Sequence, residues 1–397
     1  MKKVLLVNPF DKIPGESFRD QRFTFIYELL KNKADVVWVS SDFHHWTHRR
    51  RNLETIPTED RQRIVLIPMR EYRHNLSLSR QWSYLLYSIG AMRRIGKISP
   101  PPDLILCMAP VELMFLLALY ARMKKIAYIV DILDIWPDLF ARAFPQGWRW
   151  LARLLLLPYY FMSFIACRLA THITSVSKTY TSWAMRRGRR GDLANSSYYY
   201  LGCVGGNKAY NYSKPRDRLR CLFAGQFGFN YDVGTIIEAA KIMEDSCQKM
   251  EFIFAGDGYK LPETRRAAQG MKNVEFLGWI SSGELEQLAR DCHIGLCCYV
   301  KGATQSVPTK FFDYMSLGLC LVNSLPGEAA ALIEEEGIGI NYPAGDAKEL
   351  ARALAGLASD IGKVIETGHR SWRLSQMKYN AGIIYNRMVS ELILTSR

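Results

Sequence analysis

The sequence lacks the cysteine spacings that build metal sites and redox centres. No C-x-x-C pair occurs, and no cluster of cysteine and histidine has the spacing of a zinc site. We therefore expect the cysteines to be buried free thiols in a reducing compartment. The nine cysteines are Cys107, Cys167, Cys203, Cys221, Cys247, Cys292, Cys297, Cys298 and Cys320.

A leader and a long uncharged apolar run are also lacking. The N-terminal MKKVLLVNPF has only about four apolar residues in a row before Asn8 and no cleavage-like site, so we do not expect a signal peptide. Residues 151–170 have the length of a bilayer span, about 20 residues. Arg153, Arg168 and a central Pro158 instead favour two amphipathic or buried helices broken at Pro158, with a single span as the alternative.

Acidic residues are scarce in the first half of the chain. Residues 1–200 hold 30 lysines and arginines against 16 acidic residues, whereas residues 201–397 hold 22 of each. The whole net charge of +14 therefore lies in the first half. A basic face attracts nucleic acid, anionic lipid or a phosphorylated substrate, whereas charge that serves only solubility would be spread more evenly. No RNA- or DNA-reading motif supports a nucleic-acid partner.

The 397 residues suffice for two domains, and apolar runs alternate with helical patterns from the start. We expect helices over about 18–32 and before about 123, and strands at 2–8, 35–41, 63–69, 103–108, 126–132 and 172–177. This alternation predicts a parallel sheet with crossover helices, which binds ligands beyond the carboxyl ends of its strands.

The alternation restarts after a segment rich in Gly, Asn, Lys and Pro. We expect a first Rossmann-like domain over 1–202, a linker over 203–218 and a second Rossmann-like domain over 219–370. Its strands are RLRCLFAG, MEFIFAGDG, NVEFLGW, HIGLCCY and LCLVNS, and its helices include VGTIIEAAKIM, ELEQLARDC, TKFFDYMSLG and AKELARALAGLA. Apolar positions in 371–397 predict a helix that packs back on the first domain.

Two glycine-containing turns and one helix start are typical of a phosphate site. FAGQFG at 223–228 and FAGDG at 254–258 place glycine after a strand, where backbone N–H groups can approach a phosphate. Pro308 suits a first helical turn, and Thr309 and Lys310 would then lie at the positive end of the helix. Asp313, one turn further on, either accepts a hydrogen bond from a ribose hydroxyl or complements the helix dipole.

Taken in order, these motifs resemble glycosyltransferase family 4, whose members are retaining enzymes of the GT-B fold. The resemblance is strongest over 219–345, through FAGQFGFNYDVGTIIEAAKIM, FIFAGDGYKLPETRRAA and SVPTKFFDYMSLGLCLVNSLPGEAAALIEEEGIGI. VDILDIWPDLF resembles the D-L-W-P segment of relatives that build bacterial surface polysaccharides. The resemblance implies two doubly wound domains facing a cleft, with the C-terminal helix crossing back.

The implied activity is transfer of a sugar from a nucleotide diphosphate sugar, UDP- rather than GDP-linked, to a lipid-linked acceptor. No D-x-D motif is present and the resemblance implies no metal or other cofactor. Asp134, with Asp131 in reserve, would orient the acceptor hydroxyl or stabilise the positive centre; alternatively, one of them caps the turn at Trp136-Pro137. The implied donor-binding residues are Gly15, Gln226, Gly228, Gly256, Asp257, Gly278, Ile280, Gln305, Thr309, Lys310 and Asp313.

The sequence also departs from the family pattern. Gln305 and Asp313 occupy the positions of two glutamates, and the loop 226–231 lacks the usual arginine and lysine. Leu133 stands near the position of the usual histidine. These departures favour an alternative, a catalytically weak or inactive GT-B protein that binds a membrane or a partner. A nucleotide-sugar epimerase on the same fold is a further alternative.

Tryptophan and tyrosine interleave with arginine in 44–51, 70–87 and 142–160. Arginines are attracted to an anionic membrane surface and aromatic rings anchor at the headgroup level, so we expect a cytoplasmic protein docked on the inner face of the cell membrane. The alternative is that the aromatic residues are core and the arginines solvated. The predicted docking residues are Trp46, Arg49, Arg50, Trp82, Trp148, Arg149, Trp150 and Arg153.

Overall fold

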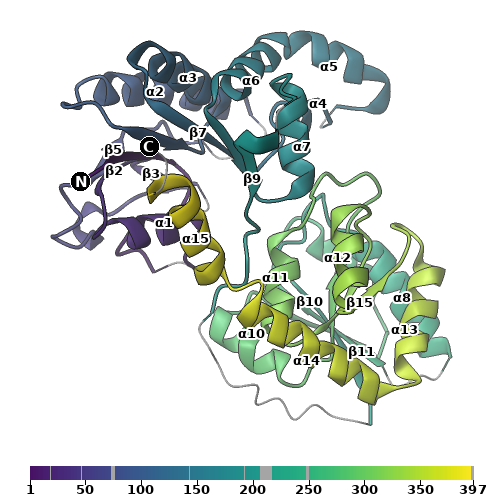
Figure 1. The fold of residues 1–397 in the computed structure, drawn as a ribbon. Helices are drawn as coiled ribbons and strands as arrows, with labels where there is room; N and C mark the ends of the chain where they lie inside the picture. Colours follow the sequence, from purple (N-terminus) through teal and green to yellow (C-terminus); the bar gives the residue numbers. More distant parts are fainter. Residues whose placement is uncertain are drawn as a thin grey trace. The chain divides into compact units, whose positions relative to one another are not determined.

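The computed structural model describes residues 1–17, 19–45, 47–72, 77–142, 144–191, 193–205, 217–246 and 250–394. Contacts divide the chain into two compact units, as the colours of Figure 1 help to follow. The first unit comprises Met1–Tyr200 together with Ile384–Arg397, and the second comprises Leu201–Ile383. Each unit is a parallel-sheet α/β fold of the Rossmann-like kind, so the predicted fold class is confirmed.

The first unit contains a seven-stranded sheet in the order β5-β2-β1-β6-β7-β8-β9, and every neighbouring pair is parallel. Its inner strands are apolar and buried, as a sheet covered on both faces requires. The strands are β1 (Lys3–Val7), β2 (Asp35–Ser41), β5 (Ile64–Ile67), β6 (Leu104–Cys107), β7 (Ala127–Ile132), β8 (His172–Ser175) and β9 (Ser196–Tyr198).

Crossover helices connect these strands, and the serine residues Ser77 and Ser177 cap the starts of α2 and α7. The short strands β3 (Phe43–His44) and β4 (Arg49–Arg50) form a separate antiparallel pair. The helices are α1 (Arg22–Leu30), α2 (Leu78–Ile95), α3 (Val111–Lys124), α4 (Asp138–Arg142), α5 (Arg149–Leu155), α6 (Leu157–Leu169) and α7 (Lys178–Arg187).

The C-terminal segment returns to the first unit. Helix α15 (Ala381–Val389) brings Tyr385 against the Arg22 guanidinium, with 5.5 Å between the guanidinium carbon and the ring centroid. The Tyr199 hydroxyl donates to Glu391 at 2.6 Å, and Lys2 Nζ donates to the Ile393 carbonyl at 2.9 Å. The segment 371–397 is nevertheless not one helix, because residues 371–377 complete α14 of the second unit.

The second unit has six parallel strands in the order β12-β11-β10-β13-β14-β15. The chain begins this sheet in the middle, at β10, and winds outward first one way and then the other. The switch point between β10 and β13 is where sheets of this order bind ligands. The strands are β10 (Leu219–Ala224), β11 (Met250–Ala255), β12 (Val274–Gly278), β13 (Ile294–Cys297), β14 (Cys320–Asn323) and β15 (Gly339–Asn341).

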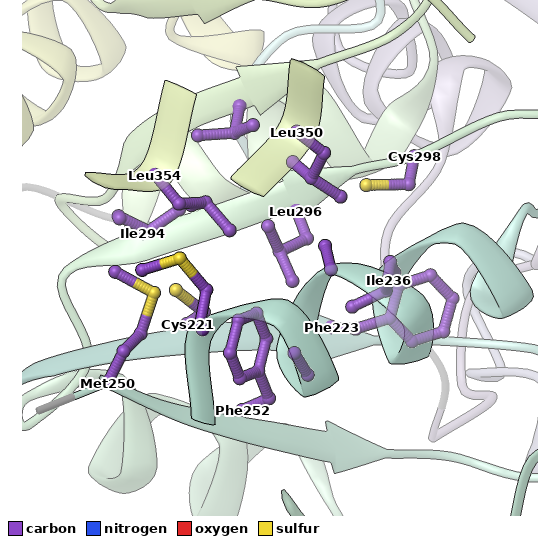
Figure 2. Packing of buried hydrophobic residues seen from close by; sticks show 14 of the residues in the cluster. Cys221, Phe223, Ile236, Met250, Phe252, Ile294, Leu296, Cys298, Leu350 and Leu354 are labelled. Carbon is purple, nitrogen blue, oxygen red and sulfur yellow. The ribbon is translucent and has the colours of Figure 1, made fainter. Parts of the chain in front are cut away.

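Apolar side chains of β10, β11 and β13 pack against helices α8 and α13 to form the core of the second unit. Figure 2 shows Phe223 and Leu296 of the sheet beside Ile236 of α8 and Leu350 of α13. The helices of this unit are α8 (Val233–Asp245), α9 (Leu261–Ala267), α10 (Ser282–Ala289), α11 (Thr309–Ser316), α12 (Glu328–Glu336), α13 (Ala347–Ala358) and α14 (Ile361–Met377).

The segment considered as a membrane span forms two helices, but the break is not at Pro158. The chain bends by 66° at Leu156, between α5 and α6, and Pro158 lies in the first turn of α6. Proline is tolerated there because the first amides of a helix have no intrahelical acceptor. No single described helix is long and apolar enough to cross a membrane. Among the described helices, only this bent pair has the combined length and apolar composition of a membrane span.

The cysteines within the described residues are free and buried, whereas Cys247 lies outside the described residues. Burial raises the pKa of Cys107, Cys167, Cys221, Cys297 and Cys298. A raised pKa keeps these thiols protonated and unreactive near neutral pH. Their role in the fold is packing, as the sequence predicts.

Candidate functional site

The carboxyl ends of β10, β11, β12 and β13 lie along one edge of the second sheet because these strands are parallel. The loops that follow them carry Gln226 and Gly228, Gly256 and Asp257, and Gly278 and Ile280. Helix α11 follows β13 and carries Thr309, Lys310 and Asp313. The second sheet therefore gathers the predicted donor-binding residues of this unit at one edge.

Lys310 is the most unusual residue of this edge. Its side chain is buried, and its ammonium nitrogen has no hydrogen-bond partner. The nitrogen lies 3.7 Å from the centre of the Phe223 ring and 4.0 Å from that of Tyr231, so two aromatic faces hold the cation. Burial lowers the pKa of Lys310 to about 7, against the opposing effect of Cys297, Cys298 and Asp313.

The ammonium of Lys310 lies directly under the loop that follows β10. A methyl group at Gly225, where φ is +138°, would approach the Lys310 nitrogen to 3.1 Å. A side chain at position 225 would therefore press against the ammonium, whereas glycine lets the loop backbone pass close over it. A buried cation without a partner is costly, so this arrangement favours an anionic ligand at the loop.

Helix α11 presents two different faces at its first turn. Pro308, the residue before the helix, provides no side-chain cap. The first amides of α11 are therefore available to an anion. Thr309 and Asp313 lie on the same face because they are four residues apart in the helix. Thr309 is exposed and Asp313 is half-buried. Lys310 points to the buried side, toward Phe223 of β10.

The structure gives the glycines of the β11 loop a packing role in addition to the predicted one. A Cβ at Gly256 would lie 1.9 Å from the Gly225 carbonyl oxygen, and one at Gly258 would lie 2.7 Å from the Phe227 carbonyl oxygen. The Phe227 amide also donates to the Asp257 carbonyl at 2.8 Å. Glycine is required here because two loop backbones touch, whether or not a phosphate binds.

The other predicted donor residues are accessible to different degrees. Gln226 and Asp257 are exposed, Gly228 is buried, and Gly278 and Ile280 are half-buried on either side of the exposed Trp279. The Gln305 side-chain oxygen is buried without a hydrogen-bond partner. The Gln305 oxygen is therefore a second unsatisfied polar atom near the start of α11, besides the Lys310 ammonium.

In the first unit, Asp131 is committed to the fold. Arg22 donates to both of its carboxylate oxygens, at 2.7 and 2.9 Å, and the Thr174 hydroxyl donates at 2.7 Å. The side chains of Arg22 and Asp131 are almost wholly buried. A carboxylate so enclosed is not available to an acceptor hydroxyl, and the reserve catalytic role predicted for Asp131 does not fit this geometry.

Asp134 differs from Asp131 because it lies beyond the carboxyl end of β7 and is exposed at the surface. Protein atoms crowd the carboxylate even so, and this desolvation raises the pKa of Asp134 to about 6. A hydrogen bond from Trp136 and the charge of Arg80 act in the opposite direction. At neutral pH the carboxylate is mostly ionised and can accept a hydrogen bond from a hydroxyl.

The loop around Gly15 is held firmly within the first unit. Arg51 is buried, pairs with Glu16 at 2.7 Å and donates to the Asp11 carbonyl at 2.9 Å. Gly15 has a φ of +90°, and a Cβ there would lie 1.8 Å from the Thr55 carbonyl oxygen. Contacts within the first unit therefore fix this loop. Closure of the loop over a ligand would have to break them.

The predicted docking residues are exposed in part. Trp82, Trp148 and Trp150 are exposed, as are Arg49 and Arg153, and Arg149 is half-buried. Arg50 is exposed but pairs with Asp42 at 2.6 Å and Glu71 at 3.0 Å, so its charge is largely offset. Trp46 lies outside the described residues. The tryptophans of α2, η2 (Gln146–Trp148) and α5 are therefore not core residues.

Sequence reasoning missed the aromatic residues that hold Lys310. It also missed the Asp138 cluster, in which Tyr160 of α6 and Trp183 and Arg187 of α7 donate to the Asp138 carboxylate. Phe223 and Tyr231 occupy ordinary positions of a strand and a loop, and no local pattern marks them as neighbours of a lysine some 80 residues away. The aromatic and arginine content of 142–160 was a usable signal for the Asp138 cluster. Its other half, on α7, was not singled out.

The fold is that of GT-B glycosyltransferases. The structure of Alr3699/HepE from Anabaena, in complex with UDP and glucose, matches with a TM-score of 0.65 and 14% identity, covering 98% of this chain and 99% of that one. Sucrose-phosphate synthase from Thermosynechococcus elongatus matches with a TM-score of 0.71 and 12% identity over 98% of each chain. WaaG, a glycosyltransferase involved in lipopolysaccharide biosynthesis, matches with a TM-score of 0.65 and 10% identity over 98% of each chain.

A family model matches most of the second unit. Residues 218–360 match the family model described as Glycosyl transferases group 1. The matched residues contain the second sheet and α11, and hence the Lys310 site. No curated protein matches the sequence significantly.

Proposed function

We propose that the protein is a glycosyltransferase that moves a sugar from a nucleoside diphosphate sugar to an acceptor hydroxyl. The observation that carries the proposal is the Lys310 ammonium, buried without a hydrogen-bond partner beneath Gly225 at the switch point of the second sheet. A diphosphate at this loop would pair with the cation. The match of residues 218–360 to group 1 glycosyl transferases supports the same conclusion.

In the proposed donor site, the diphosphate lies at the start of α11, beside the amides of Thr309 and Lys310. The ribose lies near Asp313 and the base near Gly278 and Ile280. As the bond between the anomeric carbon and the diphosphate oxygen breaks, negative charge develops on the leaving group. The Lys310 cation and the positive end of α11 stabilise that charge, which lowers the barrier.

Asp134 is the proposed acceptor-side group. As an ionised carboxylate it would accept a hydrogen bond from the acceptor hydroxyl and fix the position of that oxygen. We further propose a UDP-linked donor, retention of configuration, no need for a metal, and a lipid-linked acceptor in bacterial glycan assembly. The Anabaena structure holds UDP and glucose, which supports UDP as the first donor nucleotide to test. The exposed tryptophans of the first unit support an acceptor at a membrane surface.

The decisive experiment measures UDP binding by calorimetry at pH 7 in the natural protein and in Lys310→Met. Methionine fills a similar volume without the charge, so the core beneath the loop stays packed. We expect UDP affinity to fall at least tenfold, because a charge-assisted contact worth about 1.5–3 kcal/mol is lost. Lys241→Met, which removes an exposed lysine of α8, is the matched control and should bind UDP normally.

Unchanged UDP affinity in a folded Lys310→Met protein would show that the diphosphate does not bind at Lys310. The departures at Gln305 and Asp313 make a second function worth testing, that of a GT-B protein that binds nucleotide sugars but transfers little. Hydrolysis and transfer assays with UDP-sugars separate the two. Tight UDP binding without turnover on any lipid-linked acceptor would favour the second function.

A further inference from the structure

Helices α5 and α6 expose an apolar surface that the rest of the first unit does not cover. Trp148, Trp150, Leu155 and Phe161 expose 61%, 67%, 66% and 58% of their surface, and Leu154 and Leu157 are also exposed. Single exposed apolar residues are common, whereas a run of them on adjoining helices marks an interaction surface. The 66° bend at Leu156 spreads these side chains over two helix directions.

Two adjoining hollows lie beside this surface and share Asp138 and Arg187. The first, of about 530 Å³, is lined by Trp150, Leu154 and Leu157 of the apolar surface together with Arg153 and Tyr160. The second, of about 510 Å³, is lined by aromatic residues and further arginines: Phe164, Trp183, Arg186 and Arg189. The first hollow therefore joins the apolar surface to a cluster of arginines.

Among the described residues that line the hollows, Asp138 is the one carboxylate, and its oxygens are fully engaged. Asp138 accepts from Arg187 at 2.8 Å, from the Trp183 indole at 2.6 Å and from the Tyr160 hydroxyl at 2.9 Å. Its charge offsets only Arg187, so the lining keeps the charges of Arg153, Arg186 and Arg189. The buried Nε of Arg187 has no hydrogen-bond partner. The hollows thus offer donors and positive charge to an anion.

The cap at the end of α7 positions one of these arginines. Helices α6 and α7 approach closely: a Cβ at Gly188 would lie 3.0 Å from the Cys167 backbone, so a larger residue at 188 would fit tightly. The next residue, Arg189, has a left-handed φ of 48° because it ends α7 in a Schellman cap, in which the Arg190 amide donates to the Met185 carbonyl at 3.0 Å. Its guanidinium lies over the Phe164 ring, 5.9 Å from the centroid.

We propose that these hollows bind the phosphate of anionic phospholipid headgroups while the apolar surface of α5 and α6 inserts at the acyl boundary. Charge complementarity selects this occupant: arginines bind phosphate oxygens in a fork geometry, and exposed tryptophans beside them anchor at the headgroup level. A protein partner would not require exposed leucines and an arginine-lined hollow side by side. The inference rests on the proposed membrane acceptor, but it needs neither the nucleotide nor the Lys310 site.

The test is flotation of the full chain with vesicles of phosphatidylcholine alone and with 30% phosphatidylglycerol. The variants are Arg153→Gln/Arg189→Gln and Trp150→Ser/Leu155→Ser, and these side chains are exposed, so the fold should survive. Because each arginine near an anionic surface contributes about fivefold to partitioning, we expect the arginine pair to lower binding to anionic vesicles by more than tenfold. The apolar pair should lower it comparably.

Matched controls separate the hollows from diffuse attraction. Arg168→Gln removes an exposed arginine of α6 that lines neither hollow, and Met123→Ser removes an exposed apolar side chain of α3. Both should bind vesicles nearly as the natural protein does. Arg153→Gln and Arg189→Gln are also measured singly. If Arg168→Gln lowers vesicle binding as much as either of them, the attraction is diffuse and the headgroup site is wrong.

Two further outcomes would overturn the proposal. Saturable binding of inorganic phosphate without vesicles, combined with no flotation, would show a soluble anion site. A dimer in solution that Trp150→Ser/Leu155→Ser dissociates would show that the surface binds a second copy. UDP affinity is measured in parallel and should be unchanged in these variants, so loss of vesicle binding and failure of the donor site are distinguishable.

Discussion

Proton uptake on UDP binding follows from the position of the Lys310 ammonium. Burial lowers the pKa of Lys310 to about 7 in the protein without ligand, and a diphosphate beside the ammonium would raise it back toward the ordinary value of about 10.5. At pH 8 the free protein then has about one-tenth of Lys310 protonated, whereas the complex has nearly all of it protonated. Binding at pH 8 should take up about 0.9 proton, against about 0.5 at pH 7.

The same linkage gives a pH dependence of affinity. Above pH 7 each pH unit should weaken UDP binding by up to tenfold, about 1.4 kcal/mol, because the free protein must first gain the proton. The phosphate groups of UDP, whose pKa lies near 6, are already ionised in this range and do not contribute.

The assay is calorimetry at pH 8 in buffers of different ionisation enthalpy, where the slope of observed enthalpy gives the protons taken up. Lys241→Met should show the same uptake as the natural protein, and any residual binding by Lys310→Met should show none. Tight UDP binding with no proton uptake at pH 8 would refute the reasoning. Equal uptake by Lys310→Met would assign the proton to another group.

Three further predictions concern stability, the ribose and the acceptor. Removing the buried charge in Lys310→Met should stabilise the free protein near pH 7 by up to about 4 kcal/mol. Because the pKa of Lys310 is lowered, the stability of the natural protein rises between pH 7 and pH 10, so the gain from the substitution should shrink over this range. Urea unfolding at each pH would measure it. Asp313→Ala should weaken UDP binding by about 1–3 kcal/mol in calorimetry, and unchanged affinity in a folded protein would remove Asp313 from the ribose site. Asp134→Asn should lower kcat steeply and leave UDP affinity intact, and equal loss of both would count against an acceptor-side role.

The elements that local pattern determines were predictable. Alternating apolar runs and helical stripes predicted the main strands of both sheets. Glycines after strands and the proline before α11 marked the predicted donor-binding residues, which lie at one edge of the second sheet. Strands 2–8, 126–132 and 219–224 are recognisable because a parallel strand that is buried on both faces is largely apolar. The bend at Leu156 was placed two residues late, since proline restricts a helix start differently from a helix interior.

Tertiary structure alone decided which charged residues are committed and which remain available. In the sequence, Asp134 and its reserve Asp131 are candidates three residues apart, and no local pattern shows which of them is buried. The fold buries Asp131 in an ion pair with Arg22 of α1, a helix far from it in the sequence. Asp134 lies past the end of the strand and stays exposed. In the same way, the sequence placed Lys310 at a helix start, but only the packing of α11 on β10 sets its ammonium between Phe223 and Tyr231. Local sequence fixes secondary structure through backbone and side-chain periodicity, while burial and pairing depend on neighbours that are far apart in the chain.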